Sequence, residues 1–121
     1  MLLFLFMQAQ KISSASARQK EYARLRAQLA NAGWISEGYV QARGAGDGAG
    51  CYAWTRKVKA KTICVALSKE QYEWLKQAIA NWRTVQETLR QMQRLSREEL
   101  FTSLPNPKRR KQLSKKVLGL V

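Results

Sequence analysis

The stretch that decides the fold is CYAWTRKVKAKTICVALSKEQY, residues 51–72. Its segments 51–58 and 61–67 are rich in β-branched and aromatic side chains, which favour strands. Only two residues separate these segments, so the strands are predicted to form a tight antiparallel hairpin. Pairing Val58 with Lys61 sets the register of the whole hairpin.

This register sorts the side chains of the sheet into two faces, because strand residues alternate between faces. Residues 38–43 supply a third extended segment, and together the three predict an antiparallel meander. The predicted core face holds Val40, Ala42, Tyr52, Trp54, Ile63, Val65 and Leu67. The opposite face is small, polar and cationic, with Tyr39, Gln41, Arg43, Ala53, Thr55, Lys57, Thr62 and Cys64.

A capping box, Ser68 with Gln71, follows the hairpin and predicts the start of a helix. No glycine or proline interrupts the sequence from there to Leu95. A stripe of Tyr72, Leu75, Ile79 and Trp82 can cover the sheet. A heptad-like stripe continues along the same helix and must be buried against an earlier helix or a second copy of the protein. Its interface candidates are Val85, Leu89 and Met92.

Two further helices complete the predicted architecture. The sequence before the sheet is rich in Ala, Leu, Arg and Gln, which predicts a helix over 15–32. A second capping box predicts a short helix over 96–104. The fold class is therefore α+β, with an N-terminal helix, a three-stranded antiparallel sheet and a long C-terminal helix. We expect one domain over 13–104, preceded by an apolar segment, 1–12, and followed by a basic tail, 105–121.

The chain opens with seven apolar residues, 1–7, whereas a helix that spans a bilayer needs about 20. No basic stretch precedes this run and no clear small-residue cleavage site follows it, so an export signal is not predicted. We expect residues 1–12 to be buried or poorly ordered, or to reflect a start codon assigned too early. Contact with a membrane is not expected, and the predicted location is cytoplasmic and nucleoid-associated.

Composition narrows the classes of function. The chain has 22 Lys and Arg residues against 8 Asp and Glu residues, a net charge of +14, which favours a polyanionic partner. It has no His and only one Asp, Asp47, which argues against Ser-His-Asp catalysis and clustered-aspartate nucleases. Cys51 and Cys64 are too few for a four-cysteine zinc site. We expect no enzyme activity, cofactor, metal or small-molecule substrate.

The cationic sheet face and the tail are the candidate contacts for nucleic acid. A β-ribbon fits the major groove of B-DNA, where Arg43 and Lys57 can reach guanine edges or phosphates and Gln41 can pair with adenine. The tail is expected to be mobile when unbound and to lie along phosphates. The full set of candidate contacts is Tyr39, Gln41, Arg43, Thr55, Lys57, Lys59, Lys61, Thr62, Lys108, Arg109, Arg110, Lys111, Lys115 and Lys116.

Two other features bear on binding. The glycines of residues 44–50 alternate as in phosphate-binding loops, but a strand follows them instead of a helix. They are therefore predicted to form a hairpin tip, and contact of its backbone amides with a phosphate is the alternative. Trp74 lies off both helical stripes and is predicted to be an exposed contact or an interface aromatic.

The order of elements over 38–79 resembles the arm-type DNA-binding domain of phage-like integrases. The stretch 34–104 is similar to a family of small uncharacterised bacterial proteins found around transposons, in its Gly-Tyr-Val opening at 38–40 and in SKEQYEWLK at 68–76. Members of that family carry cysteines in the first hairpin, which this chain lacks, so no metal site is carried over. The resemblance implies a mobile-element setting. We expect an accessory DNA-binding protein; the alternatives are a homodimeric assembly module that uses the predicted long helix, and an RNA-binding protein.

Overall fold

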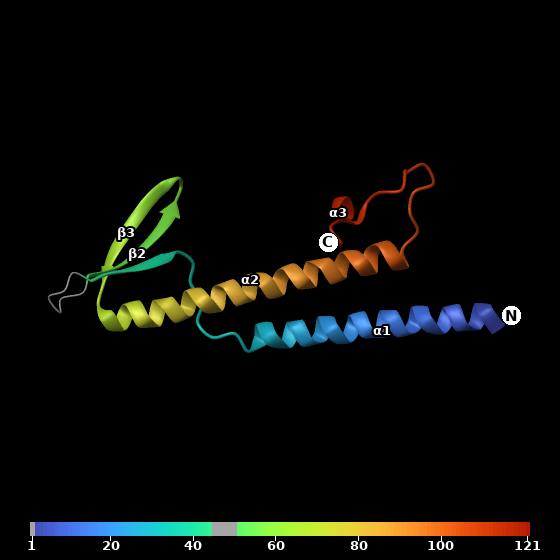
Figure 1. Ribbon diagram of the computed structural model, residues 1–121, viewed down its shortest axis with the longest axis horizontal. Coiled ribbons are helices and arrows are strands. Elements are labelled where there is room, and N and C mark those ends of the chain that lie inside the picture. The colour runs from blue at the N-terminus through green and yellow to red at the C-terminus, as the bar shows by residue number, and fades with distance from the viewer. Residues whose placement is uncertain (1, 45–50) are drawn as a thin grey trace. The chain divides into compact units, whose positions relative to one another are not determined.

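The computed structural model describes the backbone of residues 2–44 and 51–121, and the side chains of residues 14–44 and 51–121. The predicted α+β class is confirmed (Figure 1). The chain divides into two compact units, a helical unit of Met1–Asn31 with Glu87–Val121, and a sheet unit of Ala32–Gln86. The elements in chain order are α1 (Leu2–Ala30), β1 (Tyr39–Arg43), β2 (Cys51–Val58), β3 (Lys61–Leu67), α2 (Lys69–Ser103) and α3 (Lys115–Leu118).

The sheet unit contains the predicted antiparallel meander, in the order β1-β2-β3. Val58 pairs with Lys61 and Trp54 pairs with Val65, as the hairpin register requires. On the other side of β2, Val40 pairs with Trp54. The predicted register is therefore confirmed across β2 and β3, and the alternation of side chains between faces follows from it. The proposed hairpin tip of 44–50 falls, after Gly44, outside the described residues.

The core of the sheet unit lies between one face of the sheet and the first half of α2. The capping box at its start is confirmed, because the Gln71 backbone N–H donates to Ser68 Oγ at 3.1 Å and the Ser68 N–H donates to Gln71 Oε1 at 3.0 Å. The capped helix brings three buried side chains against three residues of the sheet. These residues are Leu75, Ala78 and Ile79 from α2, and Val40, Trp54 and Leu67 from the strands.

The predicted core face is covered only in part. Ile63 and Val65 are 37% and 40% exposed, and Ala42 is also exposed. The free end of the β2–β3 hairpin rises away from α2 in Figure 1, so the helix does not cover the β3 residues toward that end. Ala42 lies at the other end of the sheet, opposite Tyr52, and is also left uncovered. The expectation that these three side chains are core residues was wrong, because alternation gives the face of a strand but not the reach of the covering helix.

A tight turn without glycine joins β2 to β3. Lys59 and Ala60 have φ angles of 49° and 66°, the left-handed pair that a two-residue type I′ turn requires. A side chain at such an angle costs roughly 1–2 kcal/mol relative to the right-handed region, and glycine avoids most of this cost. The hairpin therefore carries backbone strain at its turn.

Replacing Ala60 by glycine is expected to raise the free energy of unfolding by about 0.5–1 kcal/mol, because it relieves this strain. Urea denaturation followed by circular dichroism measures the change. Ala66 lies within β3, where glycine weakens a strand, so Ala66→Gly is the matched control and should lower stability. A loss of stability in Ala60→Gly would contradict the strain argument.

The helical unit begins earlier than the sequence predicts. Helix α1 starts at Leu2 instead of near residue 15, so residues 2–12 are helical. Leu, Phe, Met, Gln and Lys all tolerate helix and no Gly or Pro interrupts them, so the serines at 13, 14 and 16 lie inside the helix instead of capping it. Helix α1 runs beside the second half of α2 in the opposite direction (Figure 1). Leu25 of α1 and Leu95 of α2 are buried in this unit.

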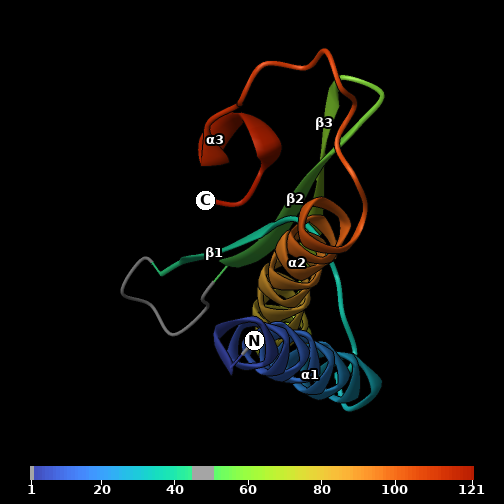
Figure 2. The ribbon, with the colours of Figure 1, turned by 90° about the vertical axis from the view of Figure 1, so that its right-hand side faces the viewer.

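The two predicted helices over 68–95 and 96–104 are one helix, α2, which continues to Ser103. Ser96 does not cap a new helix, because its hydroxyl donates to the Met92 carbonyl at 2.9 Å within the same helix. Such back-bonding satisfies the hydroxyl without ending the helix. The short helix of the structure is instead α3, in the tail, which the sequence did not predict. Helices α1 and α3 lie on opposite sides of the second half of α2 (Figure 2).

Candidate nucleic-acid interface

The sheet unit presents one uncovered face, which we call the outer face. Strand alternation and the observed pairing place six of the predicted contacts together on this face. They are Tyr39, Gln41, Arg43, Thr55, Lys57 and Thr62. Lys61 pairs with Val58 and lies on the opposite face, while Lys59 lies at the turn. The predicted grouping therefore holds for six residues and not for these two lysines.

Local contacts hold the polar groups of the outer face. The Arg43 guanidinium donates to Gln41 Oε1 at 3.2 Å, which orients both side chains of this pair. The Thr55 hydroxyl contacts Cys64 Sγ at 3.9 Å on the neighbouring strand. Ala53 and Ala66 pair on the same face and add only methyl groups beside Gln41. The outer face thus combines small side chains with hydrogen-bond donors.

Most of the positive charge belongs to the helical unit. This unit has 14 of the 22 Lys and Arg residues but only four of the eight acidic residues, whereas the sheet unit has eight cations and four acids. Each of the four acids in the helical unit is already paired with an arginine. The pairs are Arg18–Glu99, Arg24–Glu21, Arg90–Glu87 and Arg94–Glu98. The acids therefore leave the charge of the remaining cations uncompensated.

The tail contains six of these cations. Residues 100–121 contain no Asp or Glu, and the structure gives the six tail cations no acidic partner within the described residues. Arg110 is held in place, because it donates to Asn106 Oδ1 at 2.6 Å and lies 5.4 Å from the centroid of the Phe101 ring. The other tail cations that the sequence predicts as contacts are exposed: Lys108, Arg109, Lys111, Lys115 and Lys116.

The end of the tail has defined contacts, which corrects the expectation of a mobile arm for this part. Ser114 caps α3 by accepting from the Val117 N–H at 3.3 Å, and Gly119 ends the helix at a φ of 74°. The Gly119 carbonyl accepts from Arg97 of α2 at 3.4 Å. This positive φ favours glycine, and a Cβ at Gly119 would also lie 2.7 Å from the flexible end of the Arg97 side chain, which would have to shift. Lys115 and Lys116 are thereby held on a short capped helix.

Three ionisable groups among the described residues of the helical unit have shifted pKa values. Hydrogen bonds from Ser103 and then Arg18 lower the pKa of Glu99 below its ordinary value. The hydrogen bond from Arg24 lowers the pKa of Glu21, and the same bond raises the pKa of Arg24. Both carboxylates therefore remain ionised over a wider pH range than free glutamate.

The shift at Glu99 predicts a pH dependence of stability. A carboxyl whose folded pKa is lowered stabilises the fold above its unfolded pKa, near 4.5, and this contribution is lost as the pH falls through the folded value. Glu99→Gln should therefore flatten the loss of stability below about pH 4.5. Unfolding by urea at a series of pH values measures this, with Glu73→Gln as the control at an exposed glutamate. If Glu99→Gln loses stability at low pH as steeply as the parent, the contacts of Glu99 with Ser103 and Arg18 do not stabilise the fold.

The exposed aromatic prediction is confirmed and extended. Trp74 is 55% exposed, and Trp34 beside it is 77% exposed, with ring centroids 6.4 Å apart. The Trp34 carbonyl accepts from Asn81 of α2 at 2.9 Å, which holds this part of the segment before β1 against the helix. The ring centroids of Tyr52 and Tyr72 lie 4.8 Å apart. Both side chains are half-buried, in line with the predicted core face of the sheet and the predicted stripe of the helix. The sequence singled out Trp74 but gave no signal that Trp34 would join it.

The predicted interface residues do not form one continuous surface within either unit. Val85 belongs to the sheet unit, whereas Leu89 and Met92 belong to the helical unit. Val85 and Met92 are half-buried and Leu89 is exposed. The buried positions of α2 in the helical unit are Thr88 and Leu95, and neither belongs to the predicted stripe. A homodimer through Leu89 stays a prediction.

In the described part of the chain, no group of three or more His, Cys, Asp or Glu side chains could hold a metal ion. Within the same residues, none of the helices combines the length and apolar character needed to cross a membrane. Comparisons with protein-family models, curated proteins and solved structures found no match.

Proposed function

We propose that this protein binds nucleic acid, most strongly duplex DNA, through the tail and the outer face of the sheet. The observation that carries the proposal is the uncompensated charge of the tail. All four acids of the helical unit are paired with other arginines, so nothing in that unit neutralises the tail cations. Phosphates release condensed counterions when such cations approach, and this release drives association.

The outer face supplies the second contact in this proposal. Arg43 and Gln41 are oriented by their hydrogen bond, and Lys57 and Thr62 lie on the same face. Arginine can read guanine and glutamine can read adenine in the major groove, whereas the tail contacts phosphates without regard to sequence. The tail therefore provides affinity and the outer face provides any sequence preference.

The proposed setting is that of an accessory protein of a mobile element, acting near the nucleoid without catalysis of its own. The resemblance of 34–104 to transposon-associated proteins supports this setting. The chain's lack of His and its single Asp support a binding role over an enzymatic one. RNA binding and assembly through α2 are the outcomes that would replace this proposal.

Substitutions on the outer face test how the protein reads its ligand. Arg43→Ala is expected to weaken binding to a preferred duplex by about 1–3 kcal/mol, or roughly 5–150-fold, because arginine contacts base edges. Fluorescence anisotropy with duplex DNA, single strands and RNA at several salt concentrations measures both affinity and preference. Lys76→Ala is the control, since Lys76 lies on α2 over the Tyr72 ring and away from the outer face. Equal effects of the two substitutions would argue against the outer face, and stronger binding of RNA would replace DNA as the partner.

A further inference from the structure

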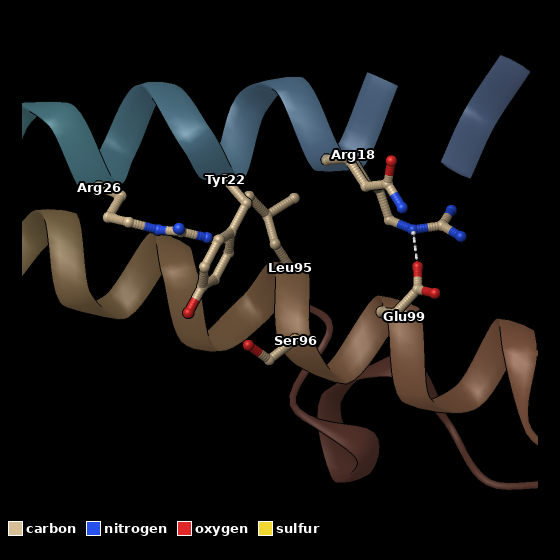
Figure 3. Close-up of a pocket in the computed structure, with 7 residues that line it drawn as sticks. Arg18, Tyr22, Arg26, Leu95, Ser96 and Glu99 are labelled. Atoms are coloured by element: carbon tan, nitrogen blue, oxygen red, sulfur yellow. Dashed lines mark hydrogen bonds and ion pairs between the residues drawn. The ribbon is translucent and has the colours of Figure 1, made fainter. Parts of the chain in front are cut away.

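A groove between α1 and the second half of α2 belongs to neither proposed nucleic-acid contact. Its cavity has a volume of about 370 Å³, within the range of small-ligand sites, and it lies inside the helical unit (Figure 3). Residues from two distant parts of the sequence line it. They are Arg18, Gln19, Tyr22 and Arg26 from α1, and Leu95, Ser96 and Glu99 from α2.

We propose that this groove binds a small organic anion, an aromatic ring that bears one carboxylate or phosphate group. Binding in this groove does not depend on nucleic-acid binding, and the ligand is a small molecule that the sequence did not predict.

One end of the groove is electrically neutral and fixed. Arg18 Nε donates to Glu99 Oε2 at 3.0 Å (Figure 3). Glu99 also accepts from the Ser103 hydroxyl at 2.8 Å. The Arg18 side chain is 16% exposed and the Glu99 side chain is 49% exposed, so the arginine lines the groove while its carboxylate partner also faces solvent. Because Arg18 is already paired, it adds no net charge to attract a ligand.

The other end of the groove has an arginine whose charge is not compensated. Arg26 lies with its guanidinium 5.4 Å from the centroid of the Tyr22 ring, and in the described residues it has no acidic partner. The four acids of the helical unit are all engaged by other arginines. The groove therefore has a net charge of +1, which is located at Arg26. The planar donors of its guanidinium match the oxygens of a carboxylate or phosphate.

The middle of the groove is apolar. Tyr22 presents its ring between the two arginines, and Leu95 lies beside it in Figure 3. Leu95 is buried and Ser96 has its hydroxyl committed to Met92, so the wall offers a ring mainly carbon surface. A ligand that stacks on Tyr22 and Leu95 while its anionic group meets Arg26 satisfies both parts of the site.

Phenyl phosphate, inorganic phosphate and phenol separate these contributions. Titrations of the whole protein followed by ¹H–¹⁵N spectra should show saturable shifts in residues 18–26 and 95–99 with phenyl phosphate in the millimolar range or tighter. Inorganic phosphate and phenol should each bind there at least about tenfold more weakly, because each lacks one half of the ligand.

Arg26→Gln should weaken phenyl phosphate binding by about 10–100-fold, the usual loss of a charge-assisted hydrogen bond. Arg24→Gln is the matched control, since Arg24 is exposed on the same helix and paired with Glu21, and it should leave the affinity unchanged. Unchanged circular dichroism confirms that both variants fold, and Tyr22→Leu provides a second variant that removes the ring. Shifts spread over all exposed cations, or equal losses in Arg24→Gln and Arg26→Gln, would overturn the proposal.

Discussion

Replacing Lys108, Arg109, Lys111, Lys115 and Lys116 by glutamine is expected to weaken binding to duplex DNA by about 10³-fold at 0.1 M salt. Each cation that engages a phosphate contributes about 0.9 to the slope of log K against log salt, so the slope should become shallower by up to about 4.5. Arg110 is left in place because its contacts with Phe101 and Asn106 hold the tail. Anisotropy titrations of the parent and the variant over a range of salt concentrations measure the change.

The control for this variant removes the same charge elsewhere. Five glutamines at exposed cations outside the tail give an equal net charge, with the substitutions at Lys20, Arg24, Lys69, Lys76 and Arg83. This control should lose much less affinity, because its cations are dispersed over α1 and the first half of α2. Equal losses in the two variants would show that net charge alone, and not the tail, carries the binding.

Leu25→Ala is expected to lower the free energy of unfolding of the helical unit by about 2–5 kcal/mol, the usual cost of removing a buried leucine side chain. Leu25 is 2% exposed, the largest fully buried side chain in the described residues. Among the side chains of this unit that the structure describes, Leu95 is the other buried apolar one, so the substitution should also release the described part of α1 from α2. Urea unfolding together with hydrogen exchange of the α1 amides measures both effects.

Gln28→Ala, an exposed substitution three residues further along the same helix, is the control for Leu25→Ala. It should change stability by less than about 0.5 kcal/mol. A loss below about 1 kcal/mol in Leu25→Ala, or α1 amides that stay as protected as in the parent, would show that α1 does not depend on this contact.

The sheet could be predicted because its signals are local. Two residues join β2 to β3, so the turn alone fixes which residues pair, and side-chain alternation then assigns the faces. The extent of the core was not predictable in the same way. Ile63 and Val65 have the same alternation as Trp54, and only the path of α2 decides which of them is covered.

The predicted helix boundaries were wrong where they rested on capping residues alone. Ser96 fits the start of a helix as well as Ser68 does, but only Ser68 follows a strand, and Ser96 is flanked on both sides by residues that favour helix. The serines near the start of the chain misled the prediction of α1 for the same reason. Caps mark a helix end only where the flanking residues allow the chain to leave the helix.

Among the candidate sites too, those with local sequence signals could be predicted and the one that depends on helix packing could not. The tail and the outer face were found from composition and alternation, which need no knowledge of tertiary structure. The groove was missed because Tyr22 and Leu95 are far apart in the sequence, and no local pattern sets the register between two helices. One signal was present: Arg18, Tyr22 and Arg26 recur every four residues and therefore share one face of α1.

The most direct test of nucleic-acid binding is a salt titration of the unmodified protein with a fluorescent duplex of about 20 base pairs. If phosphate contacts by unpaired cations drive association, log K should fall linearly with log salt with a slope of about −4 or steeper. Absence of binding at low ionic strength, or an affinity that does not change with salt, would contradict the proposed function.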